Sequence, residues 1–277
     1  MRTHVVIPDT QAKPGVPVDH LGWIGQYIVE QFRGRDVEII HLGDHADMPS
    51  LSSYDKGRKA MEGRRIDDDI DAANYAFSVL CEPIERAEAE DIKLCRQRHK
   101  PLSEAWRPPK RILLGNHEDR ISRACEADAQ LDGLLTLDAL NYAEHGWTVH
   151  PFLEPVEVDG VMYAHYFYNP MTGRPYAGQN LETRLKNIGL SFTMGHQQGL
   201  KWGRVDTIRG PHIGLVAGSC YLHDEDYKGP QGNDHWRGII VCHEVRHGSY
   251  DPMFVSLDYL CRRYEGVGLH KYTARRF

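Results

Sequence analysis

The sequence predicts an α/β fold with more than one β-sheet. Two runs rich in β-branched residues, 3–8 and 37–42, flank an amphipathic stretch, 19–33, and this order predicts parallel strands joined by a helix. Further strand-like runs in the second half of the chain predict a second sheet. They lie around 204–208, 213–218, 238–246 and 253–258. In addition, five predicted strands are each followed by side chains of the kinds that bind metal ions. These side chains therefore lie outside the carboxyl ends of the strands.

Helical spacing and helix-breaking residues predict the elements of the first half. Asp19 can cap the helix over 19–33, in which Leu21 and Ile28 share one face. A second, longer helix is predicted over 68–99 by apolar residues at helical spacing. Three prolines follow it within 100–110, and because proline cannot continue a helix, this stretch is predicted to be a loop before the strand over 111–114.

Three more elements are predicted before the last strands. Residues 119–142 alternate acidic and apolar side chains and favour a helix whose leucines enter the core. Residues 156–164 form a predicted hairpin, because Asp159-Gly160 is a strong turn dipeptide. A short helix is predicted over 180–189, just before the strand-like run over 191–194.

The composition favours a protein of the cytoplasm that has no membrane partner. The 277 residues carry a formal net charge of −6, so the chain as a whole is not a polycationic nucleic-acid binder. Its six cysteines form no C-x-x-C pair, which is typical of reduced thiols. No apolar run approaches 18 residues, the length needed for a membrane span.

The polar residues after the predicted strands form an ordered series. In chain order they are Asp9-Thr10-Gln11, Gly43-Asp44-x-x-Asp47, Gly115-Asn116-His117-Glu118, His165, and Gly195-His196-x-Gln198. This series resembles the calcineurin-like metallophosphoesterases, whose pattern is D-x-H, G-D-x-x-D, G-N-H-[DE], a lone His and G-H-x-H. The match runs from residue 5 to about 198. Gln11 and Gln198 depart from it, because the family has histidines at both positions.

The resemblance implies a specific architecture. It is a two-sheet αββα sandwich forming a single domain over 1–277, with 48–110 expected to contain a helical, basic insertion between the second and third metal motifs. The D-T-Q, G-N-H-E-D-R and G-S-C stretches also resemble small phosphoesterases of bacteriophage and prophage genomes. Such proteins are often likened to DNA-repair exonucleases.

The resemblance also implies two divalent metal ions, with Mn²⁺ as the first choice and Mg²⁺, Fe²⁺ or Zn²⁺ as alternatives. The first ion would be held by Asp9, Gln11, Asp44 and Gln198, and the second by Asp44, Asn116, His165 and His196. Both glutamines therefore fall on the first ion, which would have only oxygen ligands and favour harder cations. Whether either glutamine coordinates directly or through water stays open at this stage.

The predicted reaction is in-line attack on phosphorus by a metal-bound hydroxide, without a covalent enzyme intermediate. By resemblance His117 would act as general acid, and Asp47 would orient it and raise its pKa. The alternative for Asp47 is a helix or turn cap. His41 and His45 match no ligand position and are interpreted as structural.

Basic residues suggest a nucleic-acid or other phosphodiester substrate. The segment 56–65 has five basic residues against one acidic, and 93–111 is again rich in Lys and Arg. The predicted substrate-binding residues are Tyr54, Arg58, Lys59, Arg64 and Arg65, and Trp106 is a second candidate for stacking on bases. Solvated helix faces are the alternative interpretation of the basic clusters. A phosphomonoesterase and a non-catalytic scaffold with a degenerate metal site are the alternatives for function.

Overall fold

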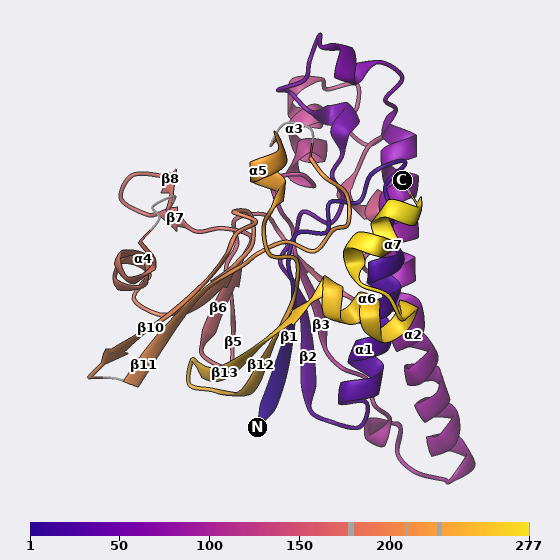
Figure 1. Cartoon of the computed structure of the whole chain (residues 1–277), viewed down its shortest axis with the longest axis vertical. Helices are drawn as coiled ribbons and strands as arrows, with labels where there is room; N and C mark the ends of the chain where they lie inside the picture. Colours follow the sequence, from indigo (N-terminus) through magenta and orange to yellow (C-terminus); the bar gives the residue numbers. More distant parts are fainter. Residues whose placement is uncertain (177–179, 209, 226–228, 277) are drawn as a thin grey trace.

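The computed structural model describes residues 1–176, 180–208, 210–225 and 229–276. A six-stranded sheet has the order β13–β12–β1–β2–β3–β4 (Figure 1). These strands are Arg2–Ile7 (β1), Val37–His41 (β2), Lys110–Leu113 (β3), Thr148–His150 (β4), Gly238–Arg246 (β12) and Ser249–Ser256 (β13). Strands β1 to β4 are parallel, as the βαβ pattern predicted for β1 and β2, whereas β12 is antiparallel to β1 and β13 is antiparallel to β12.

The second sheet has five strands in the order β10–β11–β9–β6–β5. They are Val156–Val158 (β5), Val161–Ala164 (β6), Ser191–Met194 (β9), Leu200–Thr207 (β10) and Gly210–Ala217 (β11). The predicted hairpin is confirmed: β5 and β6 pair antiparallel around Asp159 and Gly160, both with positive φ. A small separate ribbon joins Tyr168–Asn169 (β7) to Arg174–Pro175 (β8).

The assignment of 238–246 and 253–258 to the second sheet is wrong. β12 pairs with β1 in the first sheet, and β13 ends at Ser256. Ile239 packs in the core on the helical side, whereas Ile240 packs in the core between the sheets. A strand buried on both faces belongs inside a sheet, and apolar composition alone does not say which sheet.

Seven helices complete the described part of the chain. They are Asp19–Phe32 (α1), Ile66–Gln97 (α2), Asp119–Ala127 (α3), Leu181–Ile188 (α4), Gly229–Asn233 (α5), Leu257–Glu265 (α6) and Leu269–Arg276 (α7). Short 3-10 turns cover Pro49–Leu51, Lys59–Met61, Leu102–Glu104 and Leu137–Leu140. None of the helices described here combines the length and apolar character needed to cross a membrane.

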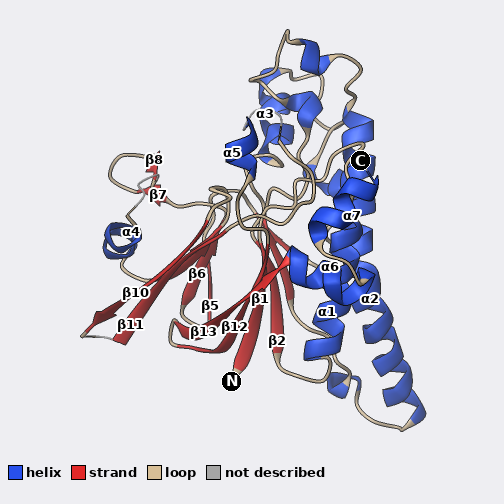
Figure 2. Cartoon of the chain, in the orientation of Figure 1, coloured by secondary structure: helices blue, strands red, loops and turns tan. Residues whose placement is uncertain are grey.

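Three apolar cores separate the layers. The largest lies between the first sheet and the helices α1 and α2, a second lies between the two sheets, and a third lies between the second sheet and α4. In Figures 1 and 2 the long helices cover one side of the molecule and α4 lies on the other, with both sheets between. This arrangement is a mixed α/β structure compatible with the predicted sandwich.

Helix α2, within the predicted insertion 48–110, is a part of the core. Phe77, Leu80 and Ile84 on this helix are fully buried in the largest core. Helix α1 can approach it closely because residue 25 is glycine: a Cβ there would meet the Leu80 carbonyl. The segment before α2, residues 48–65, lies at the top of Figure 1, and most of its residues after Ser52 are exposed.

The predicted helix over 119–142 is wrong beyond Ala127. Helix α3 ends there and the chain turns, with Gly133 at a positive φ of 78°. The leucines of the predicted helix differ in burial: Leu140 is buried, whereas Leu134 is 85% exposed. A helical period over a short window therefore did not distinguish a long helix from a helix followed by turns.

Candidate metal centre

The carboxyl ends of five parallel strands meet where the two sheets converge (Figure 1). Strands β1, β2 and β3 of the first sheet end just before Asp9, Asp44 and Asn116. Strands β6 and β9 of the second sheet end just before His165 and His196. The predicted ligands are therefore supplied by both sheets, and their positions depend on how the two sheets pack.

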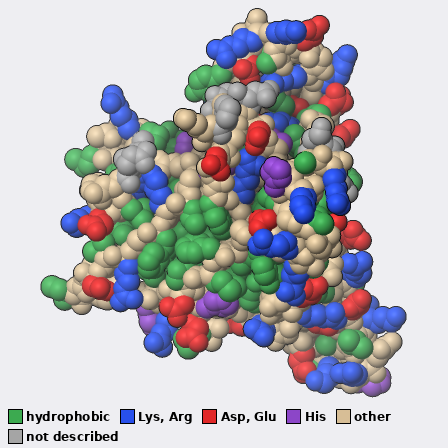
Figure 3. Space-filling view, viewed as in Figure 1, with side chains coloured by type: hydrophobic (Ala, Val, Ile, Leu, Met, Phe, Trp, Pro, Cys, Tyr) green, Lys and Arg blue, Asp and Glu red, His purple; other side chains and the backbone are tan. Residues whose placement is uncertain are grey.

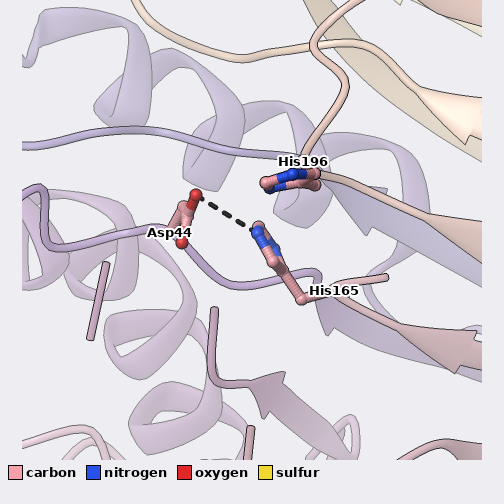
Figure 4. A group of neighbouring side chains, drawn as sticks. All are labelled: Asp44, His165 and His196. Carbon is pink, nitrogen blue, oxygen red and sulfur yellow. Dashed lines mark ion pairs between the residues drawn. The ribbon is translucent and has the colours of Figure 1, made fainter. Parts of the chain in front are cut away.

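Three of these side chains form a group that could bind a metal ion: Asp44, His165 and His196. One ligand atom from each lies within 4.8 Å of the others, and Figure 4 shows both rings on the same side of the Asp44 carboxylate. The Nε2 atom of His165 lies 3.2 Å from Asp44 Oδ2 and 3.0 Å from Asn116 Oδ1. These are the four residues predicted for the second ion.

Hydrogen bonding fixes the orientation of the His165 ring. Nδ1–H donates to the Leu42 carbonyl over 2.8 Å, so Nε2 faces Asp44 and Asn116. Burial would lower the pKa of His165, but the carboxylates of Asp44 and Asp9 outweigh it and raise that pKa to about 9. Since Nε2 faces only acceptor oxygens, a positive species belongs at this point, either a proton or a metal ion.

Two buried oxygens support the fit of a cation. Asp9 Oδ2 and Gln11 Oε1 accept no hydrogen bond from any residue that the structure describes. Burial, against the attraction of His165 and together with repulsion from Asp44, raises the pKa of Asp9 to about 7. Buried acceptors without donors are rare in folded proteins, and a divalent cation would stabilise both. The donor set is therefore suited to a metal ion.

Gln198 lies in a different environment from Gln11. It is buried, and its Oε1 accepts a hydrogen bond of 2.9 Å from the Tyr221 hydroxyl. Its backbone adopts a positive φ of 55°. An amide oxygen held by Tyr221 has one lone pair left for a cation, so the two glutamines are not equivalent.

Strained backbone is concentrated at these positions. Of the seven predicted metal residues, Gln11, Asp44, His196 and Gln198 all have positive φ values, between 42° and 66°. For a residue other than glycine this conformation costs of the order of 1–3 kcal/mol, so its repetition around one point indicates a site that the rest of the fold enforces. A Cβ on Gly115 would also collide with the Asp44 carboxylate, which explains the glycine of that motif.

Glu118 holds the loop that carries Asp44. Its fully buried carboxylate accepts hydrogen bonds from four backbone N–H groups and from one hydroxyl. The donors are Asp44, His45, Ala46 and Gly115 through the backbone, and Tyr142 through its side chain. Glu118 therefore ties the second motif to the third.

The structural interpretation of His41 and His45 agrees with their contacts. The Gly43 N–H donates to His41 Nδ1, and His41 Nε2 lies 3.2 Å from Thr10 Oγ1. Thr10 Oγ1 lies 2.7 Å from His45 Nδ1, and His45 Nε2 contacts the Ala73 carbonyl at 3.0 Å. Every ring nitrogen is satisfied when both histidines are neutral, and burial lowers the pKa of each.

His117 and Asp47 are in direct contact, as predicted. His117 Nδ1–H donates to Asp47 Oδ1 over 2.6 Å, and His117 Nε2 lies 3.7 Å from Asp44 Oδ2. Lys13 contacts the other oxygen of Asp47 at 3.0 Å, and Arg120 Nη1 donates to the Asp47 carbonyl at 2.7 Å. Asp47 therefore orients the imidazole and is itself held by two cations.

Electrostatics favour the protonated form of His117. Burial would lower the pKa of His117, but the carboxylates of Asp44 and Asp47 outweigh it and raise that pKa. Burial would raise the pKa of Asp47, yet the hydrogen bond from His117 and the charge of Lys13 hold it well below its usual range. Arg120 acts in the opposite direction, because its Nη2 lies 3.3 Å from His117 Nε2 and its charge lowers that pKa, but the two carboxylates outweigh it.

The predicted substrate-binding residues lie in the segment 48–65. Arg58, Lys59, Arg65 and Tyr54 are exposed, and Tyr54 retains 82% of its accessible surface. Arg64 is half-buried and donates to the Pro49 carbonyl and to Asp55. In Figure 3 this end of the molecule carries both basic and acidic side chains.

The basic stretch over 93–111 does not form a continuous cationic surface. Lys100, Lys110 and Arg111 pair with Glu104, Glu88 and Glu38 respectively. Trp106 was expected to stack on bases, but it is buried in the largest core. The alternative interpretation, ordinary ion-paired helix and loop surfaces, therefore accounts for these three cations.

Sequence reasoning missed an aromatic pair beside the site. Tyr166 lies 4.6 Å from the His196 ring, measured between centroids, and Tyr168 lies 5.4 Å from Tyr166. Tyr168 is 38% exposed, whereas the intervening Phe167 points into the core under α4. The signal was the alternation His165-Tyr166-Phe167-Tyr168, which places the two tyrosines on one side of an extended chain.

No protein-family model and no curated protein matches this chain.

Proposed function

We propose that this chain is a metal-dependent phosphoesterase of the calcineurin-like kind that hydrolyses phosphodiesters. One observation carries the proposal: the group of Asp44, His165 and His196 lies directly beside His117, whose Nδ1–H is held by Asp47. Metal-type ligands next to an oriented proton donor suit hydrolysis of an anionic ester better than a purely structural metal site.

Each residue has a defined part in this proposal. Asp44, Asn116, His165 and His196 would hold one ion, and Asp9 with Gln11 and Gln198 would complete a second site that shares Asp44. Bound divalent ions supply Lewis acidity and generate a nucleophile from water near neutral pH.

His117 would protonate the leaving oxygen through Nε2, the nitrogen not bound to Asp47. Arg120 would add positive charge where the phosphoryl group gains negative charge.

Two features support a diester that carries bases. Tyr168 is 38% exposed and packs on Tyr166, which in turn packs on the proposed ligand His196, and stacking on aromatic rings is the sequence-tolerant way to bind single-stranded nucleic acid. The exposed cations Arg58, Lys59 and Arg65 could contact more distant phosphates. Mn²⁺ is the ion we propose, because the ligand set mixes imidazole with oxygen donors.

A hydrolysis panel with Mn²⁺ tests the proposal. It should contain nitrophenyl phosphate monoesters and diesters, cyclic nucleotides, and single- and double-stranded DNA. We expect turnover of the diester to exceed that of the monoester, and single-stranded DNA to be cleaved. Preference for the monoester would favour a phosphomonoesterase, and absence of hydrolysis with metal demonstrably bound would favour a scaffold.

A further inference from the structure

A second cluster of metal-type ligands lies away from the strand tips, between α2 and the turn before β4. Cys81 and Glu85 are one helical turn apart on α2, and His145 belongs to the turn that precedes β4. The Sγ atom, a carboxylate oxygen and a ring nitrogen all lie within 4.8 Å of one another. None of the three takes part in the function proposed above.

We propose that Cys81, Glu85 and His145 form an additional metal site with the chemistry of a structural zinc site. Thiolate, imidazole and carboxylate are the three side-chain donors that Zn²⁺ uses in proteins. Ligand atoms around a tetrahedral zinc ion lie about 3.3–3.6 Å apart, given its bond lengths. The cluster reaches that spacing with small side-chain movements, and the charges of a thiolate and a carboxylate balance a divalent ion.

Neighbouring side chains already orient the donors. The indole Nε1–H of Trp147 donates to Cys81 Sγ over 3.2 Å, which is the kind of contact that stabilises a thiolate ligand. Phe77 packs against the His145 ring at 5.6 Å between centroids. His145 Nδ1 lies 2.7 Å from Glu85 Oε1, so binding would replace one hydrogen bond by two coordinate bonds.

A cavity reaches two of the three side chains. Glu85 and His145 line a cavity of about 780 Å³. An ion could enter through this cavity, and a water molecule in it would be the fourth ligand. Cys81 is 1% exposed, and burial raises the pKa of its thiol to about 12. Metal binding must therefore displace a proton from Cys81, as it does for cysteine ligands in general.

A metal ion here would connect helix α2 to the segment before strand β4. Helix α2 would be fixed to the turn that leads into β4, the edge strand of the first sheet. The ion would therefore stabilise the fold and need not change during the reaction at the strand tips.

Cobalt substitution tests the site separately from catalysis. Metal-stripped protein titrated with Co²⁺ should develop a thiolate-to-cobalt charge-transfer band in the near ultraviolet, because Cys81 is the thiol in this cluster. Cys81→Ser should lose the band and bind one equivalent of Co²⁺ fewer than the wild type. Asp44→Asn should keep the band, so the outcome does not depend on the phosphoesterase proposal.

Cys220 provides the matched control. It is also fully buried, and its backbone N–H donates to the Asp9 carbonyl, so its thiol is another candidate source of such a band. We expect Cys220→Ser to retain the band. If the wild type shows no band, or if Cys81→Ser keeps it, the site does not exist.

Should Cys81→Ser fail to fold, His145→Gln replaces it and should require at least about tenfold more Co²⁺ for the same band. An unchanged titration would overturn the assignment.

Discussion

At the scale of single residues, the proposed function separates proton transfer by His117 from metal binding. His117 follows the proposed ligand Asn116 in sequence, yet its own ring is hydrogen-bonded to Asp47. His117→Ala should therefore lower turnover by roughly 10²–10⁴-fold, the usual contribution of a general acid, and leave the metal content unchanged. Steady-state kinetics and metal analysis of the same preparation measure both quantities.

The exposed histidine of α7, His270, supplies the control for this substitution. His270→Ala should alter neither turnover nor metal content. Loss of bound metal in His117→Ala would make His117 a ligand, and unchanged turnover would remove it from the chemistry altogether.

Gln11 and Gln198 should determine how tightly the first ion is held. An amide oxygen is a harder and poorer donor for transition ions than an imidazole nitrogen, and Gln198 already accepts a hydrogen bond from Tyr221. In titration calorimetry of metal-stripped protein with Mn²⁺, we expect a strong and a weak class of sites at the strand tips. Replacing both glutamines by histidine should tighten the weak class.

Gln197→His is the matched control for the two glutamines. Its amide oxygen accepts from the buried Arg184, and no metal position was predicted for it. This variant should leave the weak class unchanged. Two equally tight classes in the wild type would show that the glutamines do not set the affinity.

At the scale of elements, the segment 48–65 carries the substrate prediction. Arg58, Lys59 and Arg65 are exposed there, whereas Arg64 also supports the loop through Pro49 and should be left intact. Changing the three exposed residues to Glu should weaken binding of single-stranded DNA and reduce its dependence on salt, because fewer counterions are released. Fluorescence anisotropy at several salt concentrations measures this.

Hydrolysis of a small nitrophenyl diester serves as the internal control for that variant. It should hardly change, because a small substrate does not reach beyond the metal centre. DNA binding that is independent of salt in the wild type would contradict a role for this segment.

The sequence predicted elements best where local pattern and tertiary position agree. Strands β1 and β2 and helix α1 follow from periodicity alone, and the order of polar residues after the strands led to Asp44, His165 and His196. Sheet membership of β12 could not be predicted, because both faces of an apolar strand are buried in either sheet.

The same limit applies to residues that act through tertiary contacts. Lys13 reaches Asp47, and Tyr221 reaches Gln198, only because segments far apart in sequence meet in the fold. The short strand β4 and helices α6 and α7 were also missed. Three residues carry little periodic signal in β4, and α6 follows directly from β13.

At the scale of the whole molecule, buried neutral histidines make the fold sensitive to acid. Burial lowers the pKa of His20 to about 3 and that of His45 to about 4, and it also lowers the pKa of His4. In the unfolded chain these groups bind a proton near pH 6.5. Below that pH the unfolded state therefore binds more protons than the folded state, and the free energy of unfolding falls as the pH decreases.

His20 allows this dependence to be measured at a position outside the predicted metal ligands. Its ring is buried, and Nε2–H donates to the Cys220 carbonyl over 2.9 Å, a bond that a glutamine amide can replace. Between pH 7 and pH 5 the wild type should lose about 2 kcal/mol of stability through His20 alone, at about 1.4 kcal/mol for each pH unit below 6.5. His20→Gln should lose about 2 kcal/mol less stability than the wild type over the same interval, measured by urea unfolding of metal-stripped protein.

His270→Gln, at an exposed position, should behave as the wild type does. An equal loss in His20→Gln and wild type would mean that His20 is protonated in the folded state or that the protein relaxes around it, and the acid sensitivity would then have to come from other groups.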